Sequence, residues 1–331
     1  MYPRLSDFIE NLLGVDLPFD IYSFGAMVAI AILTASWIAA RELDRMYANG
    51  LIGGVKVQRP NEKGKRPATE EVSPSTIMGA VTLIAVFGGF AGAKLFHILE
   101  NLDNFSANPG GMIFSTGGFT FYGGLIVATS AIVWLVRKKG LSVGRFTDAA
   151  GPTLILAYGI GRIGCYLAGD GDWGVCSDLD DKPSWVPTAL WSETFDRNIL
   201  GPDGTSVDVL AYMNCPVTAD GVYPTMLYEF GMGVLLFATL WSIRKHRHVA
   251  GWLFAVYLLF AGVERFLIEQ IRVNNEYPLL GMQVTQAEVI SVILILVGAA
   301  AAWWLWSPRG RNRMSESVEG ADASPPTGSK G

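Results

Sequence analysis

Residues 285–306 read TQAEVISVILILVGAAAAWWLW, and Glu288 is the only charged residue among them. A helix needs about 20 mostly apolar residues to cross the hydrocarbon core of a bilayer. The stretch is too long and too continuously apolar for a strand of a membrane barrel, in which apolar and polar residues alternate. We therefore predict a transmembrane helix here.

The rest of the chain repeats this pattern. Of its 331 residues, 50% are hydrophobic and 17% are charged, which is a composition typical of membrane proteins. Peptide groups inside a bilayer need partners within their own segment, so apolar stretches of this length favour helices. The predicted fold class is an all-α polytopic membrane protein with about seven transmembrane helices. The predicted spans are 22–40, 76–99, 119–136, 146–167, 224–243, 251–268 and 285–306.

Lysine and arginine gather in alternate loops between these spans. Cytoplasmic loops of membrane proteins carry an excess of these residues, so the pattern places the N-terminus outside and the C-terminus inside. An odd number of spans agrees with that orientation. The basic residues are Arg41, Arg45, Lys56, Arg59, Lys63, Lys65 and Arg66 in the first loop, Arg137, Lys138, Lys139 and Arg145 in the third, Arg244, Lys245 and Arg247 in the fifth, and Arg309, Arg311 and Arg313 in the tail.

Five regions follow from this reading. Residues 1–20 are acidic and carry apolar residues at helical spacing, which predicts a short helix in the membrane interface rather than a cleavable signal peptide. Residues 21–168 hold the first four spans, 169–222 form a polar outer head segment, and 223–306 hold the last three spans. The tail 307–331 is rich in Ser, Gly and Pro, and we expect it to be disordered.

The head segment contains two of the three cysteines, Cys176 and Cys215. In an oxidising outer compartment they can pair, or they can remain two small unpaired residues. Spacing alone does not decide between these alternatives. The cysteines and histidines show no metal-ligand spacing, and the net charge of −5 does not indicate nucleic acid.

A few ionisable residues lie inside the predicted spans. Each costs about 2.5–3.5 kcal/mol or more there, so such residues usually face the bundle interior and have a function. Arg162 and Arg265 would make a site for an anionic head group near the outer leaflet, because guanidinium binds phosphate bidentately. The alternative is a structural ion-pair network or snorkelling side chains, which we favour for Lys94, Glu100 and Arg272. The remaining charged or titratable residues are His97, Glu229, Glu264 and Glu269.

Glycines near the outer ends of the third and fourth spans allow two interpretations. Small residues let helices approach closely in lipid, which is the commoner use. They also leave room for a ligand to reach the backbone. These glycines are Gly123, Gly124, Gly159, Gly161 and Gly164.

Six short stretches together resemble a bacterial enzyme family, the phosphatidylglycerol–prolipoprotein diacylglyceryl transferases. They occur in the family's order over roughly residues 20 to 305. The sequence is similar to the family's Gly-Ala-Arg-Leu, Ser-Phe-His-Gly-Gly-Leu, Gly-Arg-x-Gly-Asn with Asn-Gly-Glu and Trp-Gly, His-Pro-Thr/Ser-Gln-Leu-Tyr-Glu, Arg-Phe-x-x-Glu-x-x-Arg and Leu-Thr-x-Gly-Gln motifs. The matching stretches are GGFAGAKL at 88–95, TFYGGL at 120–125, GRIGC at 161–165 with GD at 169–170 and WG at 173–174, YPTMLYE at 223–229, ERF at 264–266 with Glu269 and Arg272, and GM at 281–282 with TQ at 285–286.

The resemblance implies a function. Such an enzyme transfers the diacylglyceryl group of phosphatidylglycerol to the lipobox cysteine thiol of a prolipoprotein, which forms a thioether and releases glycerol phosphate in the first step of lipoprotein maturation. The implied partners are phosphatidylglycerol, prolipoprotein signal peptides and membrane lipid, with no cofactor and no metal. The implied location is the bacterial inner membrane, with seven spans, a periplasmic head and N-terminus, and a cytoplasmic C-terminus.

The resemblance also implies site residues. Those expected to be catalytic are Arg162, Arg265, Glu269 and Tyr122, and those expected to bind substrate are Arg162, Gly123, Gly124, Gly164, Lys94, Glu229 and Tyr228.

Two departures from the family motifs affect the chemistry, because Tyr122 replaces a histidine and Cys165 replaces an asparagine. A tyrosine with a pKa near 10 is a poorer base than a histidine with a pKa near 6.5. The thiol proton can go to Tyr122, to Glu269, or to solvent under the field of the arginines. Two other functions stay open: an inactive relative that binds lipid or peptide, and an anion transporter, against which no inverted repeat is evident.

Overall fold

The computed structural model describes residues 2–14, 18, 20–58, 69–115, 117–246, 249–279 and 282–307. The chain forms two compact units, one of Met1–Ala35 with Ala150–Gly331 and one of Ser36–Ala149. The predicted disordered tail beyond Ser307 lies outside the described residues, as do Gly281 and the basic residues Arg59, Lys63, Lys65, Arg66, Arg247, Arg309, Arg311 and Arg313.

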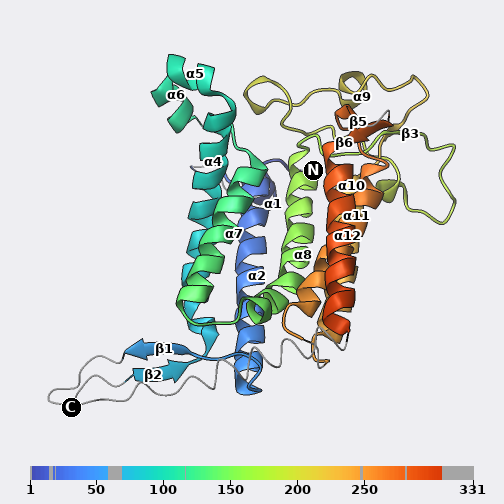
Figure 1. Ribbon diagram of the computed structural model, residues 1–331. Helices are drawn as coiled ribbons and strands as arrows, with labels where there is room; N and C mark the ends of the chain where they lie inside the picture. The colour runs from blue at the N-terminus through green and yellow to red at the C-terminus, as the bar shows by residue number, and fades with distance from the viewer. Residues whose placement is uncertain are drawn as a thin grey trace, which may run out of the picture. The chain divides into compact units, whose positions relative to one another are not determined.

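A long helical segment occupies each of the seven ranges predicted to be spans (Figure 1). Five segments are long and apolar enough to cross a membrane, and α8 and α11 are the other two. Each of these two carries three charged residues, Arg145, Asp148 and Arg162 on α8 and Glu264, Arg265 and Glu269 on α11. The segments are α2 (Ser23–Ala48), the run Pro74–Glu100, α7 (Phe121–Lys138), α8 (Val143–Ala168), α10 (Thr225–Ile243), α11 (Trp252–Glu269) and α12 (Gln286–Trp306).

The all-α prediction needs a correction, because the part of the chain that the structure describes also forms three small antiparallel sheets. Each sheet has two strands. Two of the sheets join the two sides of a loop, and the third joins the two ends of the head segment. The pairs are β1 (Val55–Gln58) with β2 (Thr69–Val72), β3 (Cys176–Ser177) with β4 (Gly221–Val222), and β5 (Glu276–Leu279) with β6 (Met282–Thr285).

In the Ser36–Ala149 unit, a glycine-lined contact joins two helices. The run Pro74–Glu100 comprises a 3-10 turn η1 (Pro74–Ile77), α3 (Met78–Leu83), a π-helical turn η2 (Ile84–Gly88) and α4 (Gly89–Glu100). A Cβ atom on Gly92 would lie 2.6 Å from the carbonyl oxygen of Gly123, and one on Gly124 would lie 2.7 Å from that of Gly89. The backbones of α4 and α7 therefore approach as closely as glycine allows. Two short helices, α5 (Leu102–Ala107) and α6 (Pro109–Phe114), connect them.

We expect Gly92→Ala to destabilise this unit by about 1–3 kcal/mol, because the added methyl group has no space between α4 and α7. Gly79→Ala, in the same helical run, is the matched control, since a Cβ atom there meets nothing within 4 Å. Thermal unfolding of the two purified variants in detergent compares them. Equal midpoints would show that the close approach of α4 and α7 is not needed.

The other unit contains α8, α10, α11 and α12 together with the N-terminal helix and the head segment (Figure 1). The predicted N-terminal helix is present as α1 (Leu5–Leu13). It is joined to the start of α2 by the hydrogen bond from the Ser23 amide to the Pro3 carbonyl, 2.9 Å, and by the ion pair of Arg4 with Asp20. Leu12 on α1 is 69% exposed.

The head segment 169–222 is mostly irregular and has its own apolar core. Trp173, Phe195 and Val222 are almost completely buried there. The segment contains two 3-10 turns, η3 (Thr188–Leu190) and η4 (Pro202–Gly204), and one helical turn, α9 (Val209–Tyr212). A disulfide joins Cys176 and Cys215, which resolves the alternative that the sequence left open.

We expect the variant Cys176→Ser/Cys215→Ser to lose about 4 kcal/mol of stability, because the disulfide closes a loop with a sequence separation of 39 residues. Cys165→Ser keeps the disulfide and serves as the control. The measurement is the unfolding midpoint with and without a reducing agent. A wild-type midpoint that does not respond to reduction would contradict this role of the disulfide.

Candidate functional site

Three guanidinium groups converge on the carboxylate of Glu229, whose side chain is completely buried near the start of α10. Arg162 of α8 donates from Nε to Glu229 Oε2 at 2.6 Å. Arg265, from α11, and Arg272, which follows α11, each place an Nη1 atom 3.6 Å from Glu229 Oε1. Glu229 therefore holds together cations from three separate segments.

Asp172 bridges two of these arginines from the loop that follows α8. Its Oδ2 lies 2.5 Å from Arg162 Nη1, and its Oδ1 lies 2.6 Å from Arg272 Nη2. Burial by itself raises the pKa of Asp172, but the two guanidinium groups outweigh it and hold the pKa below its ordinary value. Asp172 therefore stays ionised and stabilises the fold at neutral pH. This contribution is lost only as the pH falls below about 4, the ordinary pKa of an aspartate.

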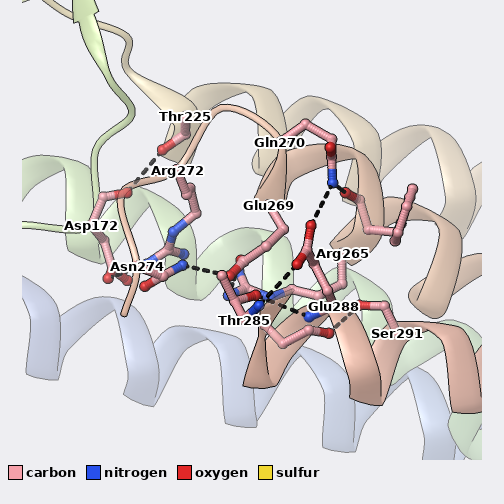
Figure 2. A network of polar contacts seen from close by, with 12 residues as sticks. Asp172, Thr225, Arg265, Glu269, Gln270, Arg272, Asn274, Thr285, Glu288 and Ser291 are labelled. Atoms are coloured by element: carbon pink, nitrogen blue, oxygen red, sulfur yellow. Dashed lines mark hydrogen bonds and ion pairs between the residues drawn. The ribbon is translucent and has the colours of Figure 1, made fainter. Parts of the chain in front are cut away.

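Arg265 also forms an ion pair with a carboxylate of its own helix (Figure 2). Arg265 Nη2 lies 2.7 Å from Glu269 Oε2, one helical turn further along α11. Asn274 donates from Nδ2 to the other oxygen of Glu269 at 2.7 Å. Nearby, Glu288 and Thr285 form the capping box of α12. Both oxygens of Glu269 are thus engaged, and the carboxylate fixes the position of Arg265.

The backbone around the cluster explains how distant parts of the chain meet. After α8 ends, Gly169 adopts a left-handed conformation with φ 61°, which lets the chain turn sharply. Further along this loop, two backbone amides donate to segments beside α10 and α11. The Gly174 amide donates to the Tyr223 carbonyl at 2.8 Å, and the Val175 amide donates to the Ile271 carbonyl at 2.9 Å. The Thr225 hydroxyl also donates to the Asp172 carbonyl at 2.8 Å. These bonds hold the ends of α8, α10 and α11 together.

A partly buried tyrosine extends the cluster along α8. The hydroxyl of Tyr158 lies 2.6 Å from Glu229 Oε1 and 3.4 Å from Glu264 Oε1. Glu264 is 4% exposed, and no ion pair to it is found among the residues that the structure describes.

The cluster has a balanced charge. Three guanidinium groups face three carboxylates, those of Asp172, Glu229 and Glu269. Within the described residues, the buried Nε–H of Arg272 has no hydrogen-bond acceptor. Guanidinium groups held in fixed orientations, with a donor unused, are suited to binding an oxyanion such as a phosphate.

Known proteins share the sequence of this chain over most of its length. A model of the prolipoprotein diacylglyceryl transferase family matches residues 11–304. The chain belongs to this family. Three relatives bear the name phosphatidylglycerol–prolipoprotein diacylglyceryl transferase. The one from Corynebacterium diphtheriae is 30% identical over 238 residues, 70% of this chain and 78% of the relative. Those from Aeromonas hydrophila and Vibrio vulnificus are each 28% identical, covering 86% and 87% of this chain and 86% and 89% of theirs.

The transferase-family motifs supply most of the cluster. Arg162, Glu229, Arg265, Glu269 and Arg272 all lie in stretches quoted for the resemblance, and the structure brings them into one network. For Arg272 the sequence favoured a structural ion-pair network or snorkelling, and the structure pairs it with Asp172 and Glu229.

Two other predicted site residues, Gly164 and Tyr228, lie in the same unit as the cluster and make packing or hydrogen-bonding contacts. A Cβ atom on Gly164 would lie 3.0 Å from the Met27 side chain and 3.2 Å from the Phe24 backbone, so Gly164 lets α8 pack closely on the first part of α2. The Tyr228 hydroxyl donates to the Leu190 carbonyl at 2.5 Å, which ties α10 to the head segment.

The remaining predicted residues lie in the Ser36–Ala149 unit. The ammonium group of Lys94 donates to the Ser115 carbonyl and hydroxyl and to the Gly117 carbonyl, at 2.7–2.9 Å, and it lies 4.8 Å from the ring centroid of Phe119. The three N–H groups of Lys94 therefore all donate hydrogen bonds to the loop before α7.

Tyr122 lies in the first turn of α7, and its ring packs edge-on against Phe121. Gly123 and Gly124 directly follow it and form the contact with α4 that was described above. Their packing role is therefore visible, and a role in binding substrate remains a prediction.

Sequence reasoning missed Asp172, Tyr158 and Asn274. Asp172 and Asn274 lie in polar loops, where such residues are ordinary, and Tyr158 lies in an apolar stretch, where a tyrosine is ordinary too. The available signal was the helical spacing of Tyr158 and Arg162, which places the two side chains on one face of α8.

Cys165, Asp170 and Asp172 present ligand atoms within 4.8 Å of one another, as metal ligands do. The Arg162 guanidinium opposes a cation there, because its Nη1 donates to both Cys165 Sγ and Asp172 Oδ2. Burial and the charge of Asp172 raise the pKa of Asp170. Cys165 packs in the core of the head segment with Trp173.

Proposed function

We propose that this chain transfers the diacylglyceryl group of phosphatidylglycerol to the lipobox cysteine of prolipoproteins, and that the arginine cluster holds the lipid phosphate. The observation that carries the assignment is the convergence of Arg162, Arg265 and Arg272 on Glu229. The family and the names of the relatives support the same reaction.

The reaction is a displacement at carbon. The cysteine sulfur forms a bond to the terminal glycerol carbon of the diacylglyceryl group, and the bond from that carbon to the phosphate oxygen breaks. Glycerol phosphate leaves with the electron pair, and the thiol proton passes to a base or to water. Charge grows on the departing phosphate, so guanidinium groups that are already in place stabilise the transition state more than the ground state.

Arg162 is the principal phosphate-binding residue in this proposal. Its side chain is 10% exposed and is oriented by Glu229 and Asp172 from two sides. In such a dry, preorganised setting a charge acts more strongly than in water. Glu269 and Glu229 serve as positioning residues that fix Arg265 and Arg162.

The proposed membrane arrangement has seven spans, with α8 and α11 added to the five apolar helices. The distribution of basic residues supports a periplasmic N-terminus and head segment and a cytoplasmic C-terminus in the bacterial inner membrane. The disulfide in the head segment is in keeping with an oxidising compartment. The exposed apolar residues of α1 support its place in the membrane interface.

The test of the function uses purified protein, phosphatidylglycerol and a peptide that carries a lipoprotein signal sequence and its cysteine. We expect the peptide to gain the mass of one diacylglyceryl group on that cysteine. A peptide in which serine replaces the cysteine is the control and should gain nothing. Lipid binding without a mass change would contradict transferase activity.

Tyr122→Phe tests the proton acceptor. We expect a loss of less than about tenfold in the transfer rate, because a neutral phenol accepts a proton poorly. The rate is followed from pH 6 to 9 beside that of the wild type. A variant with no measurable activity would instead assign the proton to the Tyr122 hydroxyl.

A further inference from the structure

The balanced charge of the arginine cluster constrains how a lipid phosphate can bind. Three guanidinium groups already face three carboxylates, so a phosphodiester would be a fourth anion at a largely buried site. An uncompensated charge in such a place is strongly unfavourable. Binding of the phosphate therefore requires that one carboxylate break its ion pairs with the arginines.

Exposure identifies which carboxylate that is. The side chains of Glu229 and Glu269 are 0% exposed, whereas that of Asp172 is 35% exposed. Only Asp172 among the three is within reach of water or of a ligand. A ligand that enters the cluster meets its carboxylate first.

The geometry of Asp172 matches that of a phosphate. Its two oxygens lie 2.5 and 2.6 Å from nitrogens of two different arginines, Arg162 and Arg272. Two oxygens of a phosphodiester can take the same places. The backbone of Asp172 is fixed by the Thr225 hydroxyl and is followed by the buried Trp173, so a rotation of the side chain alone releases the arginines.

We propose that the phosphate of phosphatidylglycerol exchanges with the Asp172 carboxylate on Arg162 and Arg272. Asp172 is thus an internal competitor that weakens lipid binding and helps to displace glycerol phosphate after transfer. The inference rests on the proposed function of the site and concerns a residue in the loop after α8, beyond the quoted Gly-Arg-x-Gly stretch.

The first experiment measures binding and turnover of Asp172→Asn. The amide cannot compete as an anion, so the dissociation constant for short-chain phosphatidylglycerol should fall about tenfold, as loss of about 1.4 kcal/mol of competition predicts. Inhibition by added glycerol phosphate should strengthen by a similar factor, and kcat should fall while KM also falls. Asp181→Asn, at an exposed site in the same head segment, should leave all three values unchanged.

A purely structural role gives another pattern. If Asp172 only braces the arginines, Asp172→Asn binds the lipid no more tightly than the wild type, and this result overturns the exchange. Because binding is measured apart from transfer, failure of the peptide assay would reject the proposed function without deciding the exchange.

The second experiment uses the wild-type protein and does not depend on whether the variant folds. Carboxyl groups are modified with a water-soluble carbodiimide and an amine, and the modification of Asp172 is measured by mass spectrometry, with Asp181 as the internal reference. Phosphatidylglycerol should increase the modification of Asp172 relative to Asp181. An unchanged or lower ratio overturns the proposal, and so does an increase that occurs with inorganic phosphate but not with the lipid.

Discussion

Arg162→Ala is expected to reduce diacylglyceryl transfer by about a hundredfold or more, since removal of one preorganised charge partner of a transition state has effects of this size. Arg162 contacts both Glu229 and Asp172, at 2.5 Å each, and no other guanidinium group within the described residues pairs this closely with both. The neighbouring arginines cannot replace the two hydrogen bonds that the Arg162 guanidinium would donate to the lipid phosphate. The rate is measured as the mass gain of the lipobox peptide at saturating phosphatidylglycerol.

Two further variants separate charge from fold. Arg162→Lys keeps the positive charge but loses the planar, bidentate fork, so its rate should lie between those of the wild type and of Arg162→Ala. Arg197→Ala changes an exposed arginine of the head segment and should be as active as the wild type. Near-normal turnover by Arg162→Ala would remove the phosphate-binding role.

Glu229→Gln is expected to lower stability by about 3–5 kcal/mol, because it leaves buried cations without their shared partner. Glu229 is 0% exposed and accepts hydrogen bonds from Arg162 Nε at 2.6 Å and from the Tyr158 hydroxyl at 2.6 Å. The amide has the same shape but offers a single neutral acceptor oxygen. Thermal unfolding in detergent, followed by circular dichroism, measures the effect.

Glu288→Gln is the matched control for this variant. Glu288 is also a carboxylate at a helix start, where it completes the capping box of α12. Glutamine can keep the same capping box, so the loss should stay below about 1 kcal/mol, well below the loss expected at Glu229. Similar unfolding midpoints for the two variants would mean that Glu229 is not the centre of the cluster.

The helices could be predicted from the sequence because hydropathy and length determine them locally. Residues 285–306 contain a single charged residue, and the structure has α12 over Gln286–Trp306. The end of the first helix was less predictable. The apolar stretch ends near residue 40, but α2 continues to Ala48, since the ion pair of Glu42 with Arg45 continues the helix among polar residues. Strands β5 and β6 were missed, since each is only four residues long.

The candidate site was predictable only in part. An arginine in an apolar stretch is costly and therefore conspicuous, which is why Arg162 and Arg265 could be selected. Asp172 could not be, because its significance depends on the bridge between Gly174 and Arg272, nearly a hundred residues apart in the chain. The roles expected for Lys94 and Gly123 were ambiguous for the opposite reason, since a charged residue or a glycine near a helix end serves packing and binding equally well.

A structure of the protein determined in bilayers that contain phosphatidylglycerol is the most direct test of the account. It should place the lipid phosphate within about 3 Å of the Arg162 guanidinium, at hydrogen-bonding distance, with the Asp172 carboxylate turned away. A phosphate bound elsewhere, with Arg162 still paired to both Glu229 and Asp172, would contradict the account.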